Sequence, residues 1–433
     1  MIITATLKAI AAMANRTINL ENFLFDLKDI RRAMYKSRFN RKIAFVVAIL
    51  AAFTLFSFQK SNEIKTGANQ PKQYLPKLNG KKVAVVANQT TVLLPSKQHL
   101  VDFLVGKEID LVRIFAPEHG FRGNHSAGAH VANGKDSKTG LPIVSLYGSN
   151  KKPTAAQMEG IDIIIFDIQD VGARFYTYIS TMHYVMEAAA ENGVQVLILD
   201  RPNPHGWHVD GPVLKDGFQS FVGMHKIPLI HGMTIGEYAQ MINGEGWLKN
   251  GLICELEIIK LKGWTHETRY SLPIAPSPNL PNDLSINLYP SLCLFEGTPI
   301  SIGRGTETPF QLIGHPEFEK TNFNSFSFSP KSIPGVSDHP KHEGKTCYGK
   351  DFTLIKDIEP ILSGSFDLNY LIKCYELSQD KTVFFTPFFN KLAGTDELKK
   401  QIQKGMAADE IKASWQGDLT SFKEIRKKYL LYP

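Results

Sequence analysis

The chain has 433 residues, 43% of them apolar and 21% charged, so it has the composition of a globular protein and room for two or three domains. Its formal net charge of +7 comes largely from a basic stretch between Arg31 and Lys42, and the remainder is close to neutral, which gives no support for a nucleic-acid partner. The 4 cysteines are widely spaced and include no Cys-x-x-Cys, so we expect neither a zinc site nor a disulfide framework, although a single disulfide is left open.

Residues 43–58 form a continuous apolar run behind this basic stretch. The run is long for a signal-peptide core and short for a membrane span, and it lacks the polar face of a helix in a cytosolic protein. We therefore expect residues 1–60 to be an N-terminal extension with a signal peptide or an uncleaved anchor. The protein would then be exported, to the periplasm, with transient membrane association through this segment. Met34 would begin a leader of more usual geometry, which suggests the hypothesis that residues 1–33 are not translated.

Residues 61–80 are polar and are expected to be a linker. Apolar segments rich in β-branched residues then alternate with helical segments as far as about residue 285. The predicted strands are 82–88, 110–115, 142–147, 161–167, 194–200 and 254–261. Helices are predicted over 99–105, over 178–192 with Gly193 as the stop, and from a capping box of Thr234 and Glu237 to about residue 243.

Strands that are apolar on both faces and alternate with helices predict a parallel sheet covered on both sides. We expect an α/β fold in which residues 81–285 form a Rossmann-like, doubly wound, mostly parallel catalytic domain. No G-x-G-x-x-G follows the first strand and no phosphate-binding P-loop motif occurs, so the fold implies no nucleotide, and we expect no cofactor.

After residue 285 the loops become longer and richer in Pro, Gly, Ser and Phe. A short strand is predicted over 352–355, and helices over 367–377, 396–404 and 408–415. Residues 286–433 are therefore expected to form a second, smaller, auxiliary α/β domain.

Polar side chains follow four of the predicted strands, and ligands of a parallel sheet bind beyond the carboxyl ends of its strands. Acidic, basic and hydroxyl or amide side chains at one edge suit a hydroxyl-rich ligand, with carboxylates for proton transfer and arginines for an anionic group. These candidates are Asn88 after the first strand; Glu118, His119 and Arg122 after 110–115; Asp167, Asp170, Arg174 and Tyr176 after 161–167; and Arg201 and Asn203 after 194–200.

Several of these residues have structural alternatives. Asp167 and Asp200 are also what a helix cap after a strand requires. Glu118 lies between Pro and His-Gly in a loop where no helix needs a cap, so a functional role is favoured for it. A metal site built from Glu118, His119, Asp167 and His205 is conceivable, but no ligand spacing supports it, and no metal is predicted.

A second group lies near the domain junction, where Asn279, Glu296, Arg304 and Glu307 fall in loops or after a short apolar run. The glycines on either side of Arg304 would let the backbone approach a ligand closely. A surface hairpin would use the same glycines, so both interpretations stay open.

From about residue 80 to its end, the chain resembles the bacterial exo-β-N-acetylmuramidase family, once a domain of unknown function. The segments that carry the resemblance are APEHGFRG, DIQDVGARFYTYIST, LDRPNPHG, SPNLPN, YPSLCLFEGTPISIGRGTETPF and KEIRKKYLLYP. The resemblance implies a Rossmann-like domain with a smaller auxiliary domain and an active site in the cleft between them. It also implies release of N-acetylmuramic acid from the non-reducing ends of peptidoglycan fragments. The glutamate of the family's Pro-Glu-His-Gly motif falls on Glu118.

Glycoside hydrolysis uses two carboxyl groups, one as acid and the other as nucleophile or base. We expect Glu118 to be the general acid/base. Its partner is expected among Asp167, Asp170, Glu296 and Glu307. Arginines able to pair with the lactyl carboxylate of the sugar are Arg122, Arg174, Arg201 and Arg304.

Retaining and inverting chemistry are both left open, and so is a role in cell-wall recycling as against scavenging. The alternative functions are a metal-dependent hydrolase of another polar substrate and a non-catalytic, muropeptide-binding protein of the cell wall.

Overall fold

The computed structural model describes residues 63–122, 133–354 and 366–433, and residues 64–433 form one compact unit. The apolar run 43–58 lies outside the described residues, so its expected role in export stays a prediction. Within the described ranges, no helix is long and apolar enough to cross a membrane.

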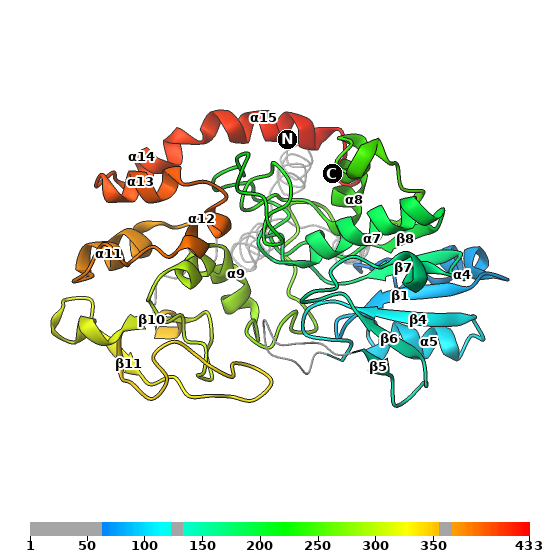
Figure 1. Ribbon diagram of the computed structural model, residues 1–433, viewed down its shortest axis with the longest axis horizontal. Coiled ribbons are helices and arrows are strands. Elements are labelled where there is room, and N and C mark those ends of the chain that lie inside the picture. The colour runs from blue at the N-terminus through cyan, green and yellow to red at the C-terminus, as the bar shows by residue number, and fades with distance from the viewer. Residues whose placement is uncertain (1–62, 123–132, 355–365) are drawn as a thin grey trace, which may run out of the picture. The chain divides into compact units, whose positions relative to one another are not determined.

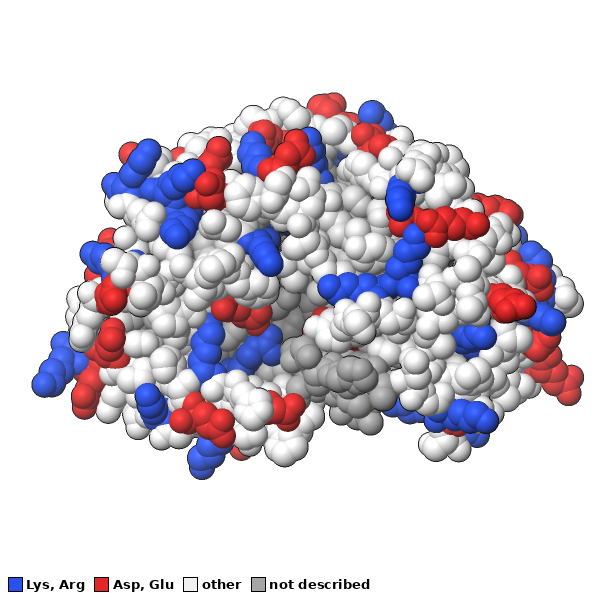
Figure 2. All heavy atoms as spheres, in the orientation of Figure 1, with Lys and Arg blue, Asp and Glu red and all other residues white. Residues whose placement is uncertain are grey.

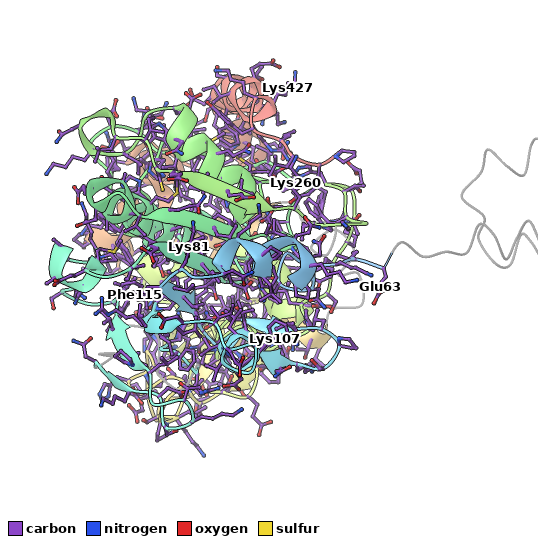
Figure 3. All side chains as sticks on the ribbon, turned by 90° about the vertical axis from the view of Figure 1, so that its right-hand side faces the viewer. Glu63, Lys81, Lys107, Phe115, Lys260 and Lys427 are labelled. Atoms are coloured by element: carbon purple, nitrogen blue, oxygen red, sulfur yellow. The ribbon has the colours of Figure 1, made fainter. Side chains whose placement is uncertain are left out.

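The core of this unit is a seven-stranded sheet in which every neighbouring pair is parallel except the pair at one edge (Figure 1). Its order is β5 (Gly134–Lys135), β6 (Pro142–Ser145), β4 (Leu111–Ala116), β1 (Val83–Ala87), β7 (Ile163–Asp167), β8 (Gln195–Leu199) and β9 (Leu256–Ile259). In Figure 3, Lys260 after β9, Lys81 before β1 and Phe115 in β4 follow one another down the view in this order. The mostly parallel sheet predicted from the sequence is confirmed.

Helices cover both faces of the sheet because successive side chains of each strand point to opposite sides. Val83, Val85 and Ala87 pack with α4 (Pro71–Leu78) and α5 (Leu100–Val105). Ala84 and Val86 belong to the larger core that includes α7 (Tyr178–Asn192) and α8 (Ile235–Gly244). The short α6 (Ala155–Met158) leads into β7. Burial on both faces explains why these strands are apolar throughout.

Two predicted helix signals are present in the structure. Gly193 ends α7 in the left-handed region at φ 64°, and the Thr234 and Glu237 side chains each accept a hydrogen bond from the other's backbone N–H at the start of α8. The prediction of a linker over 61–80 is wrong from residue 64 onward, because Thr66, Ala68 and Gln70 are buried and residues 71–78 form α4, which buries Tyr74 and Leu78.

The C-terminal part contains a three-stranded antiparallel sheet of order β10 (Leu312–His315), β12 (Cys347–Asp351) and β11 (Phe326–Phe328). Its helices are α9 (Asp283–Leu292), α11 (Asn369–Leu377), α12 (Pro387–Ala393), α13 (Glu397–Gln403), α14 (Ala408–Ser414) and α15 (Gln416–Lys427). Short 3₁₀ helices are η1 (Lys249–Gly251), η2 (Cys293–Gly297), η3 (Pro316–Lys320) and η4 (Phe352–Leu354). β2 (Val92–Leu93) pairs with β3 (Gln98–His99).

The strand predicted over 352–355 is wrong as far as the structure describes it. Asp351 Oδ1 accepts hydrogen bonds from Thr353 N (2.8 Å) and Thr353 Oγ1 (2.6 Å). This local turn ends β12 and starts η4, since a short aspartate competes with the sheet for backbone donors.

The end of the chain returns to the Rossmann-like part, and α15 brings it beside α8 (Figure 1). Tyr432 donates its hydroxyl proton to Asp200 Oδ2 and accepts from Leu261 N (3.0 Å), while His266 N donates to Pro433 O (2.8 Å). Asp200 also accepts from Gly236 N at the start of α8, which agrees with the capping alternative for this residue.

Candidate active site

Glu118 lies in a tight turn directly after β4. Gly120 N donates to Pro117 O (3.0 Å), and both His119 (φ 70°) and Gly120 (φ 77°) are in the left-handed region. That conformation costs a non-glycine residue about 1 kcal/mol or more, and such strain gathers at functional sites. The turn leaves Glu118 half-buried, with its carboxylate lining a cavity.

The position of this turn follows from the order of the strands. From β1 the chain builds the sheet outward through β4 and β6, and then continues on the other side of β1 with β7. Loops diverge at such a switch point, and ligands of open α/β sheets bind there. Thr177, between β7 and α7, donates its hydroxyl proton to Glu118 Oε2 (2.7 Å), which joins the two loops.

The cavity has a volume of about 640 Å³ and is lined from both parts of the chain. The Rossmann-like part supplies Glu118, His119, Tyr147, Phe175, Tyr176, Thr177, Phe221, Val222, Ser277, Asn279 and Leu280. The C-terminal part supplies Tyr289, Cys293, Glu296, Ser301, Ile302, Arg304, Phe310, Val336, Ser337, Asp338, His339, Pro340, Lys341, Phe388 and Leu392.

Glu296 and Arg304 form an ion pair on the C-terminal wall of the cavity. Glu296 lies in η2, and Arg304 lies between two glycines in the left-handed region, Gly303 (φ 75°) and Gly305 (φ 81°). Arg304 Nε lies 3.0 Å from Glu296 Oε1, and the two side chains are 26% and 24% exposed. Burial opposes the charge of Arg304, but Glu296 outweighs it and raises the pKa of the guanidinium.

Tyr147 connects the two carboxylates electrostatically. It follows β6 and lines the cavity. Burial raises its pKa, and both the charge of Glu118 and a hydrogen bond with it add to this increase, followed by the charge of Glu296. Tyr147 is therefore a neutral O–H donor at physiological pH, within the electric field of both carboxylates.

Aromatic rings form much of the remaining wall. Tyr289 makes edge-to-face contacts with Phe175 (5.2 Å), Tyr176 (5.7 Å) and Phe310 (5.1 Å between ring centroids). Tyr176 donates to Pro276 O (2.8 Å), so its hydroxyl is already used. Flat rings beside hydroxyl, amide and charged groups match the mixed apolar and polar surface of a sugar.

The cavity brings six of the predicted site residues together: Glu118, His119, Tyr176, Asn279, Glu296 and Arg304. The other eight do not line it: Asn88, Arg122, Asp167, Asp170, Arg174, Arg201, Asn203 and Glu307. The roles of the first group stay predictions that this geometry supports, whereas those of the second group find no support in it.

Asp167 and Arg201 bind each other beneath the sheet edge. Arg201 Nε and Nη2 lie 2.6 and 2.9 Å from the two oxygens of Asp167, which is 0% exposed, and Arg201 Nη2 also donates to Val92 O (3.1 Å). Both charged groups are fully engaged, so neither can reach a substrate. The pair ties the ends of β7 and β8 to β2.

Arg174 is fully buried and turned away from the cavity. Its guanidinium donates to the carbonyls of Pro212 (2.7 Å), Ile227 (2.8 Å), Leu392 (3.0 Å) and Ala393 (2.7 Å). The last two belong to the end of α12, where carbonyls without helical partners attract a cation. Arg174 therefore links the two parts of the chain.

Three further candidates serve the loops behind the cavity. Asp170 Oδ2 accepts from Gly172 N (2.6 Å), and Asn203 bonds the backbone of His205 and Met233. Burial raises the pKa of Asp170 to about 7. Asn88 is buried and accepts from Thr90 through Oδ1.

The last two candidates lie at the surface. Arg122 pairs with Asp136 (3.0 Å), and Glu307 is exposed. On the face shown in Figure 2, acidic and basic side chains are interspersed, and no extended area carries a single charge.

The polar residues of the cavity that were not predicted from the sequence include Tyr147, Thr177, Asp338 and Lys341. Tyr147 ends a predicted strand and Thr177 precedes a predicted helix, so the strand-end argument that selected Glu118 could have found both. Asp338 and Lys341 lie in a loop without periodic pattern, and nothing in the sequence points to them.

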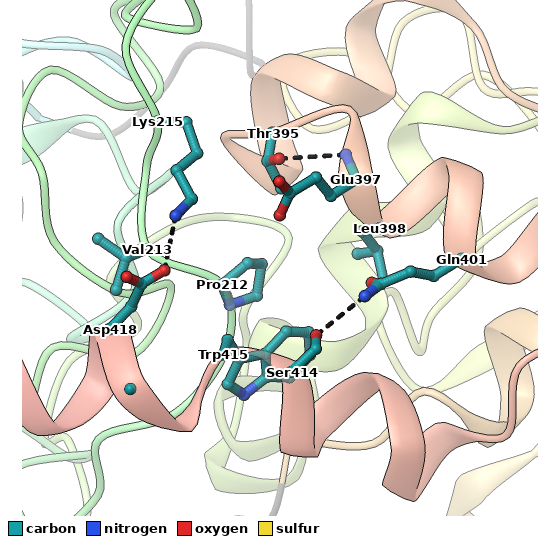
Figure 4. A pocket seen from close by; sticks show the side chains of 11 residues that line it. Pro212, Val213, Lys215, Thr395, Glu397, Leu398, Gln401, Ser414, Trp415 and Asp418 are labelled. Carbon is teal, nitrogen blue, oxygen red and sulfur yellow. Dashed lines mark hydrogen bonds and ion pairs between the residues drawn. The ribbon is translucent and has the colours of Figure 1, made fainter.

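A second cavity of about 330 Å³ lies among the segment after residue 211 and the last helices (Figure 4). Its polar groups bind one another: Lys215 pairs with Asp418 (2.7 Å), and Gln401 donates to Ser414 Oγ (2.9 Å). None of its lining residues directly follows a strand of the seven-stranded sheet, so we do not assign the active site to it. Within the described ranges, no group of three or more His, Cys, Asp or Glu side chains is arranged to hold a metal ion.

The chain matches two family descriptions in sequence order. These are "Exo-beta-N-acetylmuramidase NamZ, N-terminal" over residues 83–284 and "Exo-beta-N-acetylmuramidase NamZ, C-terminal" over residues 287–432. A relative, peptidoglycan beta-N-acetylmuramidase NamZ of Bacillus subtilis (strain 168), is 38% identical over 388 residues, which cover 86% of this chain and 92% of that protein.

Two similar solved structures are of DUF1343 family proteins from Bacteroides fragilis NCTC 9343. They are 48% and 32% identical, with TM-scores of 0.78 and 0.67, and each alignment covers 86% of this chain and 99% of the other. The resemblance found in the sequence motifs is thereby confirmed, and the chain belongs to the exo-β-N-acetylmuramidase NamZ family.

Proposed function

We propose that this protein is an exo-β-N-acetylmuramidase, a glycoside hydrolase that removes terminal N-acetylmuramic acid from the non-reducing ends of peptidoglycan fragments. One observation carries the proposal: Glu118 and Glu296, from different parts of the chain, line one cavity in a protein of this family. Two carboxyl groups flanking one substrate site are what glycoside hydrolysis requires.

The cavity fits a sugar in size and chemistry. A volume of about 640 Å³ lies within the usual range of small-molecule sites, and the aromatic wall offers apolar faces for a pyranose ring. Arg304 has five N–H donors, and Glu296 uses only part of them. The remaining donors are available for the lactyl carboxylate that distinguishes N-acetylmuramic acid from N-acetylglucosamine.

In the proposed mechanism Glu118 donates a proton to the glycosidic oxygen as the bond from that oxygen to the anomeric carbon breaks. Glu296 lies on the C-terminal wall. In the retaining form an oxygen of Glu296 bonds to the anomeric carbon as the glycosidic bond breaks, whereas in the inverting form Glu296 removes a proton from the water that bonds to that carbon. Thr177 holds Glu118 by the 2.7 Å hydrogen bond, and Arg304 holds Glu296. In the retaining form Glu118 then removes a proton from the water that displaces Glu296 from the anomeric carbon.

The apolar run 43–58 supports the further proposal that the enzyme is exported to the periplasm and associates transiently with the membrane through this segment. Fractionation of cells should find the protein in the periplasmic or membrane fraction. Recovery of a chain with residues 43–58 intact from the cytosol alone would contradict export.

The purified protein should be incubated with a chromogenic β-glycoside of N-acetylmuramic acid and with the same glycoside of N-acetylglucosamine. We expect release of the chromophore from the first substrate only. Hydrolysis of neither glycoside, or of the second alone, would refute the proposed function.

A further inference from the structure

The segment 295–300, which carries Glu296, is held by its carbonyl groups. Lys341 Nζ donates to four of them: Phe295 O (2.9 Å), Glu296 O (3.1 Å), Ile300 O (3.4 Å) and, closest of all, Thr298 O. His342 Nε2 lies 2.7 Å from Pro299 O, and Thr386 donates to Gly297 O through N (2.9 Å) and Oγ1 (3.1 Å). Every carbonyl from residue 295 to residue 300 therefore has a side-chain or backbone donor from a distant part of the chain.

Lys341 is the centre of this arrangement. An ammonium group has three N–H donors, and four carbonyl oxygens surround it as they would surround a monovalent cation. Among the described residues, no carboxylate lies within ion-pair distance of its Nζ. The next residue, His342, has a φ of 58°, which lets both side chains reach the same segment. The left-handed region is unfavourable for a non-glycine residue, so the surrounding hydrogen bonds hold His342 there against backbone strain.

These hydrogen bonds hold both the backbone and the carboxylate of Glu296 in place. Lys341 fixes the backbone of Glu296, and Arg304 fixes its carboxylate from the other side. Lys341 lies on the loop that also contributes Val336, Asp338 and Pro340 to the cavity. Loss of the ammonium would release the carbonyls and allow Glu296 to move with its segment.

We propose that Lys341 is a positioning residue that acts as a built-in cation and keeps Glu296 in its place in the cavity. The inference rests on the proposed function and deepens it, because it names the group on which the second carboxylate depends. Lys341 acts through the backbone of Glu296 and not by contact with the reacting atoms.

Charges around Lys341 allow a test by pH. The residue as a whole is exposed, but its ammonium lies among four carbonyl oxygens, and burial there lowers its pKa to about 8. Glu296 opposes the shift, and Arg304 adds to it; Cys293 faces the same site, with a pKa raised by burial. As the pH rises through about 8, the ammonium loses the proton that satisfies the carbonyls, so activity should fall on this side.

The experiment compares Lys341→Met, Lys341→Arg and Lys341→Ala with the wild type on the chromogenic N-acetylmuramic acid glycoside. We expect kcat of Lys341→Met to fall by roughly 10- to 100-fold, with little change in KM, because small displacements of a catalytic group cost rates of this order. Lys341→Arg should retain more activity and move the alkaline limb upward, since a guanidinium stays charged. Added propylammonium should raise kcat of Lys341→Ala in a saturable manner, and should not do so for Glu296→Gln.

Lys345, an exposed lysine on the same loop that does not line the cavity, supplies the matched control Lys345→Met, which should behave as the wild type. An unchanged kcat and alkaline limb in Lys341→Met would overturn the inference, as would a loss confined to KM, which would mean direct contact with substrate.

Amide hydrogen exchange gives a readout that needs no substrate. Exchange over residues 295–300 should increase in Lys341→Met and not in Lys345→Met, and equal exchange in both would refute the role of Lys341 in holding this segment even if the glycosidase activity itself were confirmed. Failure of the wild type to hydrolyse the glycoside would refute the proposed function, and with it the role assigned to Glu296, whatever the exchange shows.

Discussion

Replacing Arg174 with methionine should destabilise the protein and leave substrate affinity unchanged. Arg174 was a candidate for the substrate's carboxylate by its position after a strand, but its guanidinium binds four buried carbonyls and lies outside the cavity. Methionine preserves most of the side-chain volume and removes all four donors. The perturbation therefore separates a structural role from a binding role.

The cost can be worked out from these contacts. Each buried carbonyl left without a partner costs about 1 kcal/mol or more, so four of them cost about 4 kcal/mol. Unfolding entropies of about 2.1 cal/mol/K per residue turn this into a decrease in Tm of roughly 5 °C for a unit of this size. Burial lowers the pKa of Arg174 to about 9, which shows that burying its charge is itself unfavourable. The substitution removes that cost as well, so we expect a loss of stability near about 4 kcal/mol and not above it.

Thermal and urea unfolding measure the stability, and steady-state hydrolysis of the glycoside measures kcat and KM. The variant for comparison is Arg304→Met, because Arg304 lines the cavity and its side chain is 26% exposed. It should raise KM or lower kcat by at least 10-fold while changing Tm little. An unchanged Tm with a raised KM in Arg174→Met would refute the assignment of Arg174 as a link between the two parts.

Three further predictions concern buried groups that do not line the cavity. Asp167→Asn should lower the free energy of unfolding by about 3 to 5 kcal/mol, because it leaves Arg201 as an uncompensated buried charge, and urea unfolding that shows less than 1 kcal/mol would contradict this. Tyr432→Phe should cost about 1 to 3 kcal/mol by removing the hydroxyl that bonds Asp200 and Leu261 N, as measured by the same method; an unchanged midpoint would show that the C-terminal tail does not anchor the fold. Burial raises the pKa of Asp170 to about 7, so its contribution to stability is complete below pH 4 and is lost as the pH rises through 7, by up to about 4 kcal/mol. Asp170→Asn should therefore gain stability relative to the wild type between pH 4 and pH 8, and a difference that does not change with pH would refute the shift.

The sheet could be predicted from the sequence because its strands are buried on both faces. The β-branched run Ile163–Ile165 followed by Phe166 favours a strand buried on both faces, and β7 indeed lies between β1 and β8. Gly193 predicted the end of α7, and the capping box of Thr234 and Glu237 predicted the start of α8, because both signals depend only on neighbouring residues. In contrast, α15 was not predicted, since it is mostly polar and its buried residues are only Leu419 and Phe422.

The site was predictable to the level of strand ends and not to the level of side-chain direction. Glu118 follows β4, the neighbour of β1 on one side of the switch point, and the rule that ligands bind beyond strand ends includes it among the candidates. Arg174 and Arg201 satisfy the same rule, yet they turn inward to partners such as Ala393, 219 residues away in the chain. Lys341 depends on a loop that crosses to residues 295–300, a contact that no local pattern encodes.

The most direct test of the central claim is the rate at which Glu118→Gln releases N-acetylmuramic acid from the non-reducing end of a peptidoglycan fragment. Glutamine keeps the size of the side chain and a hydrogen bond with Thr177 but cannot transfer the proton. General acid/base catalysis contributes roughly 10²- to 10⁴-fold, so kcat should fall by that factor while Tm and fragment binding stay near those of the wild type. A variant that retains near-normal kcat would contradict the assignment of Glu118 and of this cavity as the catalytic site.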